Sequence, residues 1–270
     1  MAIELLRWCN IKMALADKGC WFLWLLAPLW VQAAPLDPAV AHGKKMLYVM
    51  NYHEVELAKQ EDPPRPELVK MKQEVLDEDW KVVAHLKSLG FNVTTCDETG
   101  DVKLAKGMDL VVVSESVNAN EVANKYTLLT IPVVLWENDI YDDMRMTGKR
   151  LRVDYGTMSP GVTALQLWNA PHQLSAELSA GKHEVLRIAA PINWGRPGLG
   201  ATIIATVPDQ PDKVTIFAYE KGATMEYDYM APGRRVTFFA NRNYFDNLTP
   251  DGRALFDATF LWAVSPPVRE

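Results

Sequence analysis

Cysteine is the scarcest residue of this sequence, and its scarcity limits how the fold can be stabilised. The chain of 270 residues holds three cysteines, Cys9, Cys20 and Cys96. The first two precede residue 34, in a stretch that we expect to be removed from the mature protein. A single remaining cysteine cannot form an internal disulfide, so the mature domain must depend on its hydrophobic core.

Clusters of basic residues are also missing. The formal net charge is −6, and the lysines and arginines are scattered along the chain. Proteins that bind nucleic acid or anionic membranes usually carry a concentrated positive surface. We therefore expect no nucleic-acid partner. An apolar content of 49% with 23% charged residues is that of an ordinary globular protein.

No apolar run is long enough to span a bilayer. Residues 21–31 (WFLWLLAPLWV) form a run of about 11 residues, which is typical of the core of a signal peptide. Lys12 and Lys18 precede it, and Val31 and Ala33 place small residues where a signal peptidase would cleave. These features predict a signal peptide over residues 1–33, a secreted or periplasmic protein, and no stable membrane span after cleavage.

Alternatives stay open for this first segment. Met13 could be the true start, cleavage could fail and leave an anchor, or the run could be a buried helix of the fold. A lipoprotein anchor is not expected, because Cys20 precedes the apolar run. After the signal peptide we expect a leader, one domain and a short tail. They cover residues 34–43, 44–264 and 265–270.

Four segments predict the strands of a parallel sheet, of which the second alternates apolar with polar residues and the third and fourth are apolar runs typical of buried strands. They cover residues 45–50, 91–95, 108–113 and 131–136. Apolar residues at helical spacing predict a helix over residues 67–89 and a shorter one over residues 120–129. Strands that alternate with helices in this way are typical of a doubly wound α/β sheet.

Beyond residue 147 the pattern changes to short β-like runs with turn residues between them. These runs cover residues 151–155, 164–168, 184–190, 201–207, 214–219 and 235–240. Their spacing is typical of hairpins, so we expect an antiparallel extension of the sheet. Thr249 and Pro250 then begin a final helix, as an N-cap followed by proline at the first helical position.

Polar residues follow the predicted strands at the point where each strand ends. Ligands of open α/β sheets bind beyond the carboxyl ends of the strands, which share one edge of the sheet. We therefore expect a binding cleft there, although exposed strand-end loops are polar in most α/β proteins. The candidate binding residues are Asn51, Tyr52, His53, Ser114, Glu115, Ser116, Glu137, Asn138, Tyr141 and Asn241.

Sequence motifs for nucleophilic catalysis are absent. Neither G-x-S-x-G nor G-x-C-x-G occurs, and Ser114 or Ser116 would need His53 as a base from another strand. Two carboxyl groups could act as acid and base if burial raised the pKa of one of them. The candidate catalytic residues are therefore Glu137 together with His53 or Glu115.

An acidic loop follows the fourth predicted strand. Glu137, Asp139, Asp142 and Asp143 offer oxygen ligands of the kind that calcium or magnesium prefers. Their spacing matches neither an EF-hand nor the H-E-x-x-H pattern, and acidic loops are usually solvated. We therefore predict neither a metal nor an organic cofactor.

Two of the predicted strands carry a family resemblance. Residues 109–113 (DLVVV) and 132–137 (PVVLWE) resemble the third and fourth strands of the class I glutamine amidotransferase-like fold. Four further segments are similar to the trehalose-utilisation (ThuA-like) branch and to domains of exported, multi-domain bacterial proteins. They are residues 154–157, 169–174, 217–223 and 235–239. The resemblance covers residues 44–264.

This resemblance implies a flavodoxin-like sheet with an added hairpin region. In that fold the nucleophilic cysteine sits in the elbow after a central strand, where this chain has Trp136 and Glu137. ThuA-like members often carry glycine-histidine after the late strand, where this chain has Ala240 and Asn241. Both differences remove groups that glutamine hydrolysis needs.

We therefore predict an exported, non-catalytic domain that binds a small molecule or carbohydrate in a strand-end cleft. One alternative is a carboxylate-dependent hydrolase that acts on a carbohydrate-like substrate. The other is a purely structural or interaction module. A concave pocket shared by Glu137 and an acid–base partner would favour the hydrolase, and a flat apolar patch would favour the module.

Overall fold

The computed structural model describes residues 35–241 and 244–267. The predicted signal peptide over residues 1–33 lies outside this range, together with Cys9 and Cys20. Cys96 is a free and buried thiol. No helix of the described part is long and apolar enough to cross a membrane.

Five parallel strands form one half of the sheet. Their order across the sheet is β2-β1-β3-β4-β11, and each neighbouring pair is parallel. Counted along the chain, this is the order 2-1-3-4-5 of flavodoxin-like folds, so the predicted fold class is confirmed. The strands are β1 (Lys45–Met50), β2 (Asn92–Asp97), β3 (Leu110–Val113), β4 (Val133–Leu135) and β11 (Arg235–Thr237).

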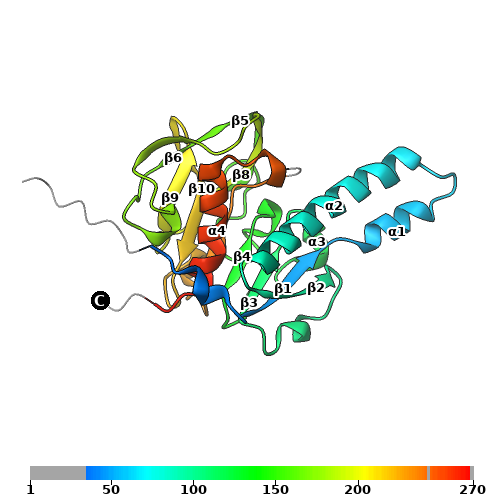
Figure 1. Cartoon of the computed structure of the whole chain (residues 1–270), viewed down its shortest axis with the longest axis horizontal. Helices are drawn as coiled ribbons and strands as arrows, with labels where there is room; N and C mark the ends of the chain where they lie inside the picture. Colours follow the sequence, from blue (N-terminus) through cyan, green and yellow to red (C-terminus); the bar gives the residue numbers. More distant parts are fainter. Residues whose placement is uncertain (1–34, 242–243, 268–270) are drawn as a thin grey trace, which may run out of the picture. The chain divides into compact units, whose positions relative to one another are not determined.

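The sheet continues beyond β11 through antiparallel strands, as the hairpin spacing predicts. The order there is β10-β9-β6-β7, and β8 joins β10 and carries β5. This half lies to the left of the parallel half in Figure 1. The strands are β5 (Tyr155–Val162), β6 (Ala164–Leu167), β7 (Gly181–Glu184), β8 (Ala190–Gly195), β9 (Thr202–Val207) and β10 (Gln210–Tyr219).

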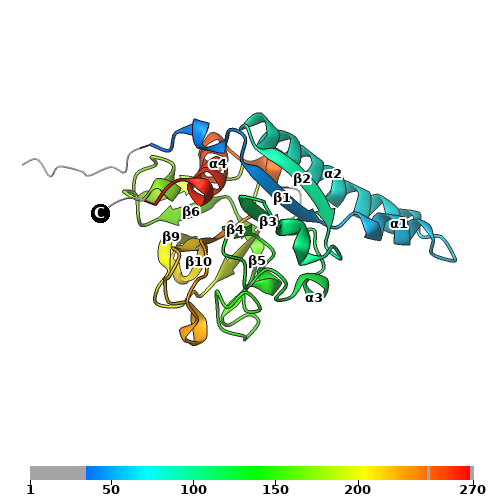
Figure 2. The same cartoon turned by 90° about the horizontal axis from the view of Figure 1, so that it is seen from below.

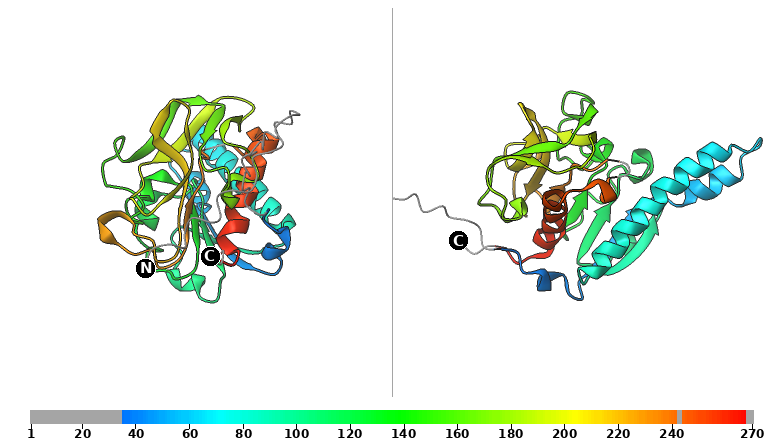
Figure 3. Two further views of the ribbon diagram at one scale, coloured as in Figure 1. Left: turned by 90° about the vertical axis from the view of Figure 1, so that its left-hand side faces the viewer. Right: turned by 45° about the horizontal axis from the view of Figure 1, so that its top comes forward.

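Two long helices, α2 (Pro66–Ser88) and α4 (Pro250–Val264), cover one face of the parallel strands. The hydroxyl oxygen of Thr249 accepts a hydrogen bond from the amide of Gly252 at 3.1 Å, which is the predicted N-cap. Helix α1 (His53–Lys59) pairs with α2 in a hairpin that projects from the sheet (Figure 3). The short α3 (Ala119–Val122) lies on the other side of the sheet (Figure 2).

The hydrophobic core has two parts, one on each face of the parallel strands. In β1 the side chains of Met46, Tyr48 and Met50 belong to the part that α2 and α4 cover. Leu47 and Val49, which alternate with them, belong to the other part. Both sets are buried, which explains why β1 appears in the sequence as a continuous apolar run.

The helix predicted over residues 120–129 is much shorter than expected. It ends at Val122 because Ala123 has a positive φ of 40°, which an α-helix cannot accommodate. Turns then lead the chain toward β4. The helix predicted over residues 67–89 is confirmed as α2.

Two of the predicted β runs are not strands. Residues 151–154 form a turn before β5, in which Arg152 has a φ of 64° and the carboxylate of Asp154 accepts the amide of Arg150 at 3.0 Å. Residues 185–189 connect β7 to β8, and the amides of Val185 and Leu186 both donate to the carbonyl of Thr163. A local turn in the first segment and hydrogen bonds to Thr163 in the second therefore replace the expected strand pairing.

Candidate functional site

A crevice opens at the strand-end edge, between α2 and the segments that follow β3, β4 and β11. Its volume is about 10 Å³, which is room for about one water molecule. A whole sugar ring does not fit into this space, although a single small group does. Val75, Ser116 and Asn241 are partly exposed and form its rim. The lining residues are Val75, Glu78, Asp79, Ser114, Glu115, Ser116, Trp136, Asn241 and Tyr244.

Asp79 of α2 is the centre of a buried hydrogen-bond network. Its Oδ1 accepts from the hydroxyls of Tyr48 at 2.7 Å and Ser114 at 2.5 Å. Ser114 Oγ accepts from the amide of Ser116 at 3.2 Å, and Ser116 Oγ accepts from the amide of Asn51 at 3.2 Å. The network therefore connects α2 to the ends of β1 and β3.

Burial controls the electrostatics of this network. It raises the pKa of Asp79 to about 6, against the lowering effect of the hydroxyl partners. Burial and the nearby Asp79 carboxylate raise the pKa of Tyr244 well above its ordinary value. A carboxyl group with a pKa near 6 can change its protonation state close to neutral pH.

Three buried polar atoms of the crevice have no hydrogen-bond partner in the described part of the chain. They are Asp79 Oδ2, Trp136 Nε1 and Tyr244 Oη. A buried polar group without a partner costs about 1–3 kcal/mol. Unsatisfied atoms of this kind are uncommon in folded proteins, and three at one crevice mark it as a candidate binding site.

Trp136 occupies the position directly after the central strand β4. Its indole is fully buried, and its ring centroid lies 6.0–6.2 Å from the rings of Tyr48, Tyr244, Phe256 and Phe260. This position therefore directs an aromatic ring into the core. It does not present a nucleophile to solvent.

The sequence analysis did not identify Glu78, Asp79 or Tyr244 as site residues. A signal for Asp79 exists, because Val75, Asp79 and Val82 follow the helical spacing of three and four residues on the buried face of α2. A charged residue on such a face needs a polar partner from another element. No comparable signal identifies Tyr244, which tertiary folding brings to the crevice.

Four of the predicted binding residues line the crevice, namely Ser114, Glu115, Ser116 and Asn241. Asn241 is held by Asn193 of β8, whose Oδ1 accepts from Asn241 Nδ2 at 2.9 Å. Asn193 Nδ2 donates in turn to the carbonyls of Trp136 at 2.6 Å and Ala240 at 3.1 Å. A buried asparagine from the antiparallel half thus fixes the ends of β4 and the segment after β11.

The predicted residues that follow β1 do not line the crevice. Asn51 reaches the network only through its amide. Tyr52 and His53 donate their amides to Asp97 Oδ2, and His53 Nδ1 lies 3.0 Å from Asp97 Oδ1 and 3.9 Å from Glu98 Oε1. His53 is therefore associated with the carboxyl groups of Asp97 and Glu98 at the end of β2. It does not line the crevice that contains the candidate nucleophiles.

Beyond Trp136, the predicted residues that follow β4 do not line the crevice. Glu137 Oε1 accepts the amide of Asp139 at 2.8 Å and caps the short 3-10 helix η3 (Asn138–Ile140). Asn138 Oδ1 accepts from the hydroxyl of Thr157 at 3.1 Å. Tyr141 is fully buried in the core on the opposite face of the sheet. A ligand role for these residues stays a prediction, and they do not line the crevice.

The acidic loop does not gather its carboxylates around one point. The part of the chain that the structure covers contains no group of three or more His, Cys, Asp or Glu that could hold a metal. Asp142 and Asp143 instead line a surface hollow of about 770 Å³ together with Lys125, Arg145 and Lys149. Charges of both signs therefore offset one another in this hollow.

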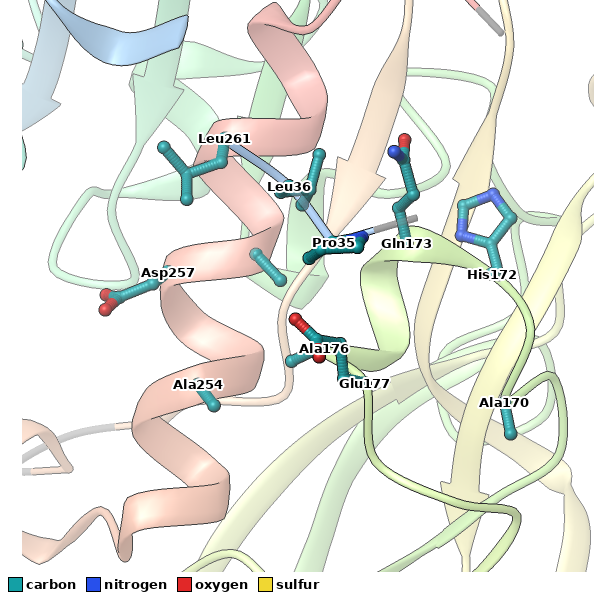
Figure 4. A pocket seen from close by; sticks show the side chains of 11 residues that line it. Pro35, Leu36, Ala170, His172, Gln173, Ala176, Glu177, Ala254, Asp257 and Leu261 are labelled. Carbon is teal, nitrogen blue, oxygen red and sulfur yellow. The ribbon is translucent and has the colours of Figure 1, made fainter. Parts of the chain in front are cut away.

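A separate cavity of about 180 Å³ lies beside α4 (Figure 4). Residues 35–36, the 3-10 helix η4 (Gln173–Ser175) and α4 contribute to its walls. Burial lowers the pKa of His172 at its edge. None of the predicted site residues lines this cavity.

Comparisons with known proteins give similarity of fold. No protein-family model and no curated protein matches this sequence. A solved structure described as a ThuA-like protein from Bacteroides uniformis has 12% sequence identity and a TM-score of 0.54, and the match covers 86% of this chain and 95% of the other. A protein from Thermoplasma acidophilum, described as one of the subunits of GMP synthase, has 12% identity and a TM-score of 0.39, with coverage of 83% and 95%.

At this level of identity the first match shows the fold alone, and the second is too weak to add to it. The sequence resemblance to ThuA-like proteins is confirmed at the level of architecture. The chain therefore shares its fold with this ThuA-like protein.

Proposed function

We propose that this protein is an exported, non-catalytic ThuA-like domain that binds a small polar molecule or a carbohydrate at the strand-end crevice. One observation carries the proposal. The buried indole of Trp136 occupies the position where the fold resemblance implies a nucleophile, while a polar crevice remains beside it. A site that keeps its recognition groups without a reactive group is suited to binding.

The other candidate nucleophiles support a non-catalytic role. Burial raises the pKa of Cys96 to about 11, so its thiol stays protonated and unreactive at neutral pH. Ser114 is 3% exposed and donates its hydroxyl proton to Asp79. A buried hydroxyl in this position cannot approach the carbonyl group of a substrate that stays at the rim.

A carboxylate-dependent hydrolase is the second candidate. The pairing of Glu137 with His53 has little geometric support, because Glu137 caps η3 and His53 bonds to Asp97. One observation favours a different pair. Asp79, whose pKa is raised to about 6, lines the same crevice as Glu115. Hydrolysis of chromogenic glycosides that Asp79→Asn abolishes would replace the binding proposal with this one.

Export rests on the apolar run over residues 21–31 and the small residues that follow it. We expect the mature chain to begin near residue 34 and to be found in the periplasm or the medium. N-terminal sequencing of the protein purified from each cell fraction tests this. A cell-associated product that still begins at Met1 or Met13 would contradict it.

A thermal-shift panel of sugars, run beside a glycan array, tests the binding proposal. A ligand that binds only the folded state raises the melting temperature by mass action. We expect a hit with the wild-type protein and a smaller shift in Asn241→Ala, which alters the rim of the crevice. Asn120→Ala, an exposed position on α3, is the matched control. An equal shift in both variants would place binding elsewhere.

A further inference from the structure

We infer that the crevice receives one neutral hydroxyl group of the ligand, held jointly by Asp79, Trp136 and Tyr244. This inference rests on the proposed function and makes it more specific. It assigns a chemical class, alcohols and sugars, to the group that enters the crevice. Two of the three side chains, Asp79 and Tyr244, are residues that the sequence analysis did not single out.

The burial of the three side chains makes their unsatisfied atoms significant. Asp79 is 4% exposed, Trp136 is 0% exposed and Tyr244 is 5% exposed. Asp79 Oδ2, Trp136 Nε1 and Tyr244 Oη find no hydrogen-bond partner within the described residues. Because bulk water does not reach these atoms freely, only a group that enters the crevice can satisfy them.

The three side chains come from different elements and line one crevice. Asp79 belongs to α2, Trp136 follows β4, and Tyr244 precedes the 3-10 helix η6 (Phe245–Asn247). All three line the same volume of about 10 Å³. That space admits about one oxygen-sized atom with its hydrogens.

Donor and acceptor chemistry selects the group. Trp136 Nε1 can only donate, ionised Asp79 can only accept, and the Tyr244 hydroxyl can do either. A carboxylate could accept from Trp136, but it has no proton to give to Asp79. An ammonium group could donate to Asp79, but it cannot accept from Trp136. Of these three groups only a hydroxyl both donates and accepts, so it complements all three atoms.

The size of the crevice sets the position of the rest of the ligand. A sugar ring is too large to enter, so it would lie over the partly exposed rim of Val75, Ser116 and Asn241. A single water has the same hydrogen-bonding capacity as a hydroxyl, and it would occupy the crevice of the free protein. The ligand hydroxyl displaces this water and reproduces its hydrogen bonds, which keeps the exchange favourable.

The test compares neutral and charged sugars on matched variants. D-glucose, D-galactose, D-mannose and myo-inositol are titrated beside glucosamine and glucuronate, with melting temperature and calorimetric affinity as readouts. The proteins are wild type, Tyr244→Phe and Asp79→Asn, with Tyr227→Phe and Asp77→Asn as exposed controls. Asn in place of Asp79 keeps an acceptor for Tyr48 and Ser114 but turns a donor toward the crevice. Circular dichroism checks that each variant is folded.

We expect a neutral sugar to bind wild type and both controls alike. Its affinity for Tyr244→Phe and Asp79→Asn should be about tenfold lower, because each change leaves a buried partner unpaired. If Asp79→Asn does not fold, Tyr244→Phe alone decides the outcome.

Three results would overturn the inference. Equal affinity for wild type and Tyr244→Phe would refute it while leaving the proposed binding function intact, with only a structural water in the crevice. Tighter binding of glucuronate or glucosamine that depends on Tyr244 would assign a charged group instead. Failure of every probe to bind wild type would remove the proposed carbohydrate function and this inference together.

Discussion

Two buried carboxyl groups lie at neighbouring strand ends of this protein, and they are used in different ways. Asp79 lies against the ends of β1 and β3, and Glu98 directly follows β2. Burial is the largest cause of the raised pKa of each, to about 6 for Asp79 and about 7 for Glu98. Desolvation therefore raises the pKa of both carboxyl groups at this edge of the sheet.

The partners of the two carboxyl groups differ. Glu98 Oε2 accepts the amide of Asn118 at the start of α3, and the imidazole of His53 lies 3.9 Å from Glu98 Oε1. Asp79 is bonded by two hydroxyl groups and lines a crevice that also contains unsatisfied donors. The backbone contact gives Glu98 a role in ordering a loop. The polar crevice is the reason we propose a recognition role for Asp79.

The largest difference between the two regions is the aromatic packing beside Asp79, and Trp136→Ala would remove it. Deleting a buried indole with four ring neighbours leaves a cavity and should cost about 3–5 kcal/mol of unfolding free energy. Urea denaturation measures this. Trp168→Ala, at a side chain that is 56% exposed, is the matched control and should cost far less. Similar costs for both variants would contradict the described core.

Asp79→Asn should change how stability depends on pH. The ordinary pKa of 3.8 rises to about 6 on folding, so the native state binds the proton more tightly than the unfolded chain. Wild type therefore loses stability as pH rises from about 4 to about 7, by about 3 kcal/mol. The asparagine variant should lack this loss. Denaturation at several pH values, with Asp77→Asn as control, measures the difference, and parallel curves would argue against a raised pKa.

Glu98→Gln should show an effect of the same sign in a window about one pH unit higher. Its pKa rises from 4.5 to about 7 on folding, so wild type loses about 3 kcal/mol as pH rises through this interval. Glutamine keeps an acceptor for the amide of Asn118. Binding of sugar at the crevice should stay unchanged. Weaker binding in this variant would mean that the two carboxyl groups act as one site.

His53→Gln should have the smallest effect. The imidazole is 35% exposed, so its pairing with Asp97 is screened by solvent and should contribute less than about 1 kcal/mol. We also expect unchanged sugar-induced shifts and no change in any glycosidase activity. A complete loss of either one would restore the hydrolase in which His53 acts as a base.

Local patterns were sufficient for the parallel half of the fold. Continuous apolar runs identified β1, β3 and β4, and helical spacing identified α2 to within a residue at each end. Both patterns arise from burial: a strand covered on both faces is apolar throughout, and a helix covered on one face is apolar at helical spacing. The antiparallel half was harder, since β7 and most of β5 and β8 are only partly apolar. Their partners, rather than their own residues, keep them extended.

The candidate site shows the same division. Strand-end reasoning correctly placed Ser114, Glu115, Ser116 and Asn241 together at one edge. It could not show that Tyr141 packs into the opposite face, or that His53 turns toward Asp97. Side-chain direction after a strand depends on the next few backbone dihedrals, which residue type alone does not specify.

The sequence by itself determined the parallel strands, the helix that covers the sheet, the absence of a nucleophile elbow and the edge where polar groups collect. These are properties of composition and period, and they follow from burying apolar surface. Only the tertiary structure decided that Asp79, Trp136 and Tyr244 share one small space. Trp136 lies 57 positions and Tyr244 lies 165 positions after Asp79 in the sequence. Their proximity depends on how three elements pack, and no local sequence pattern specifies it.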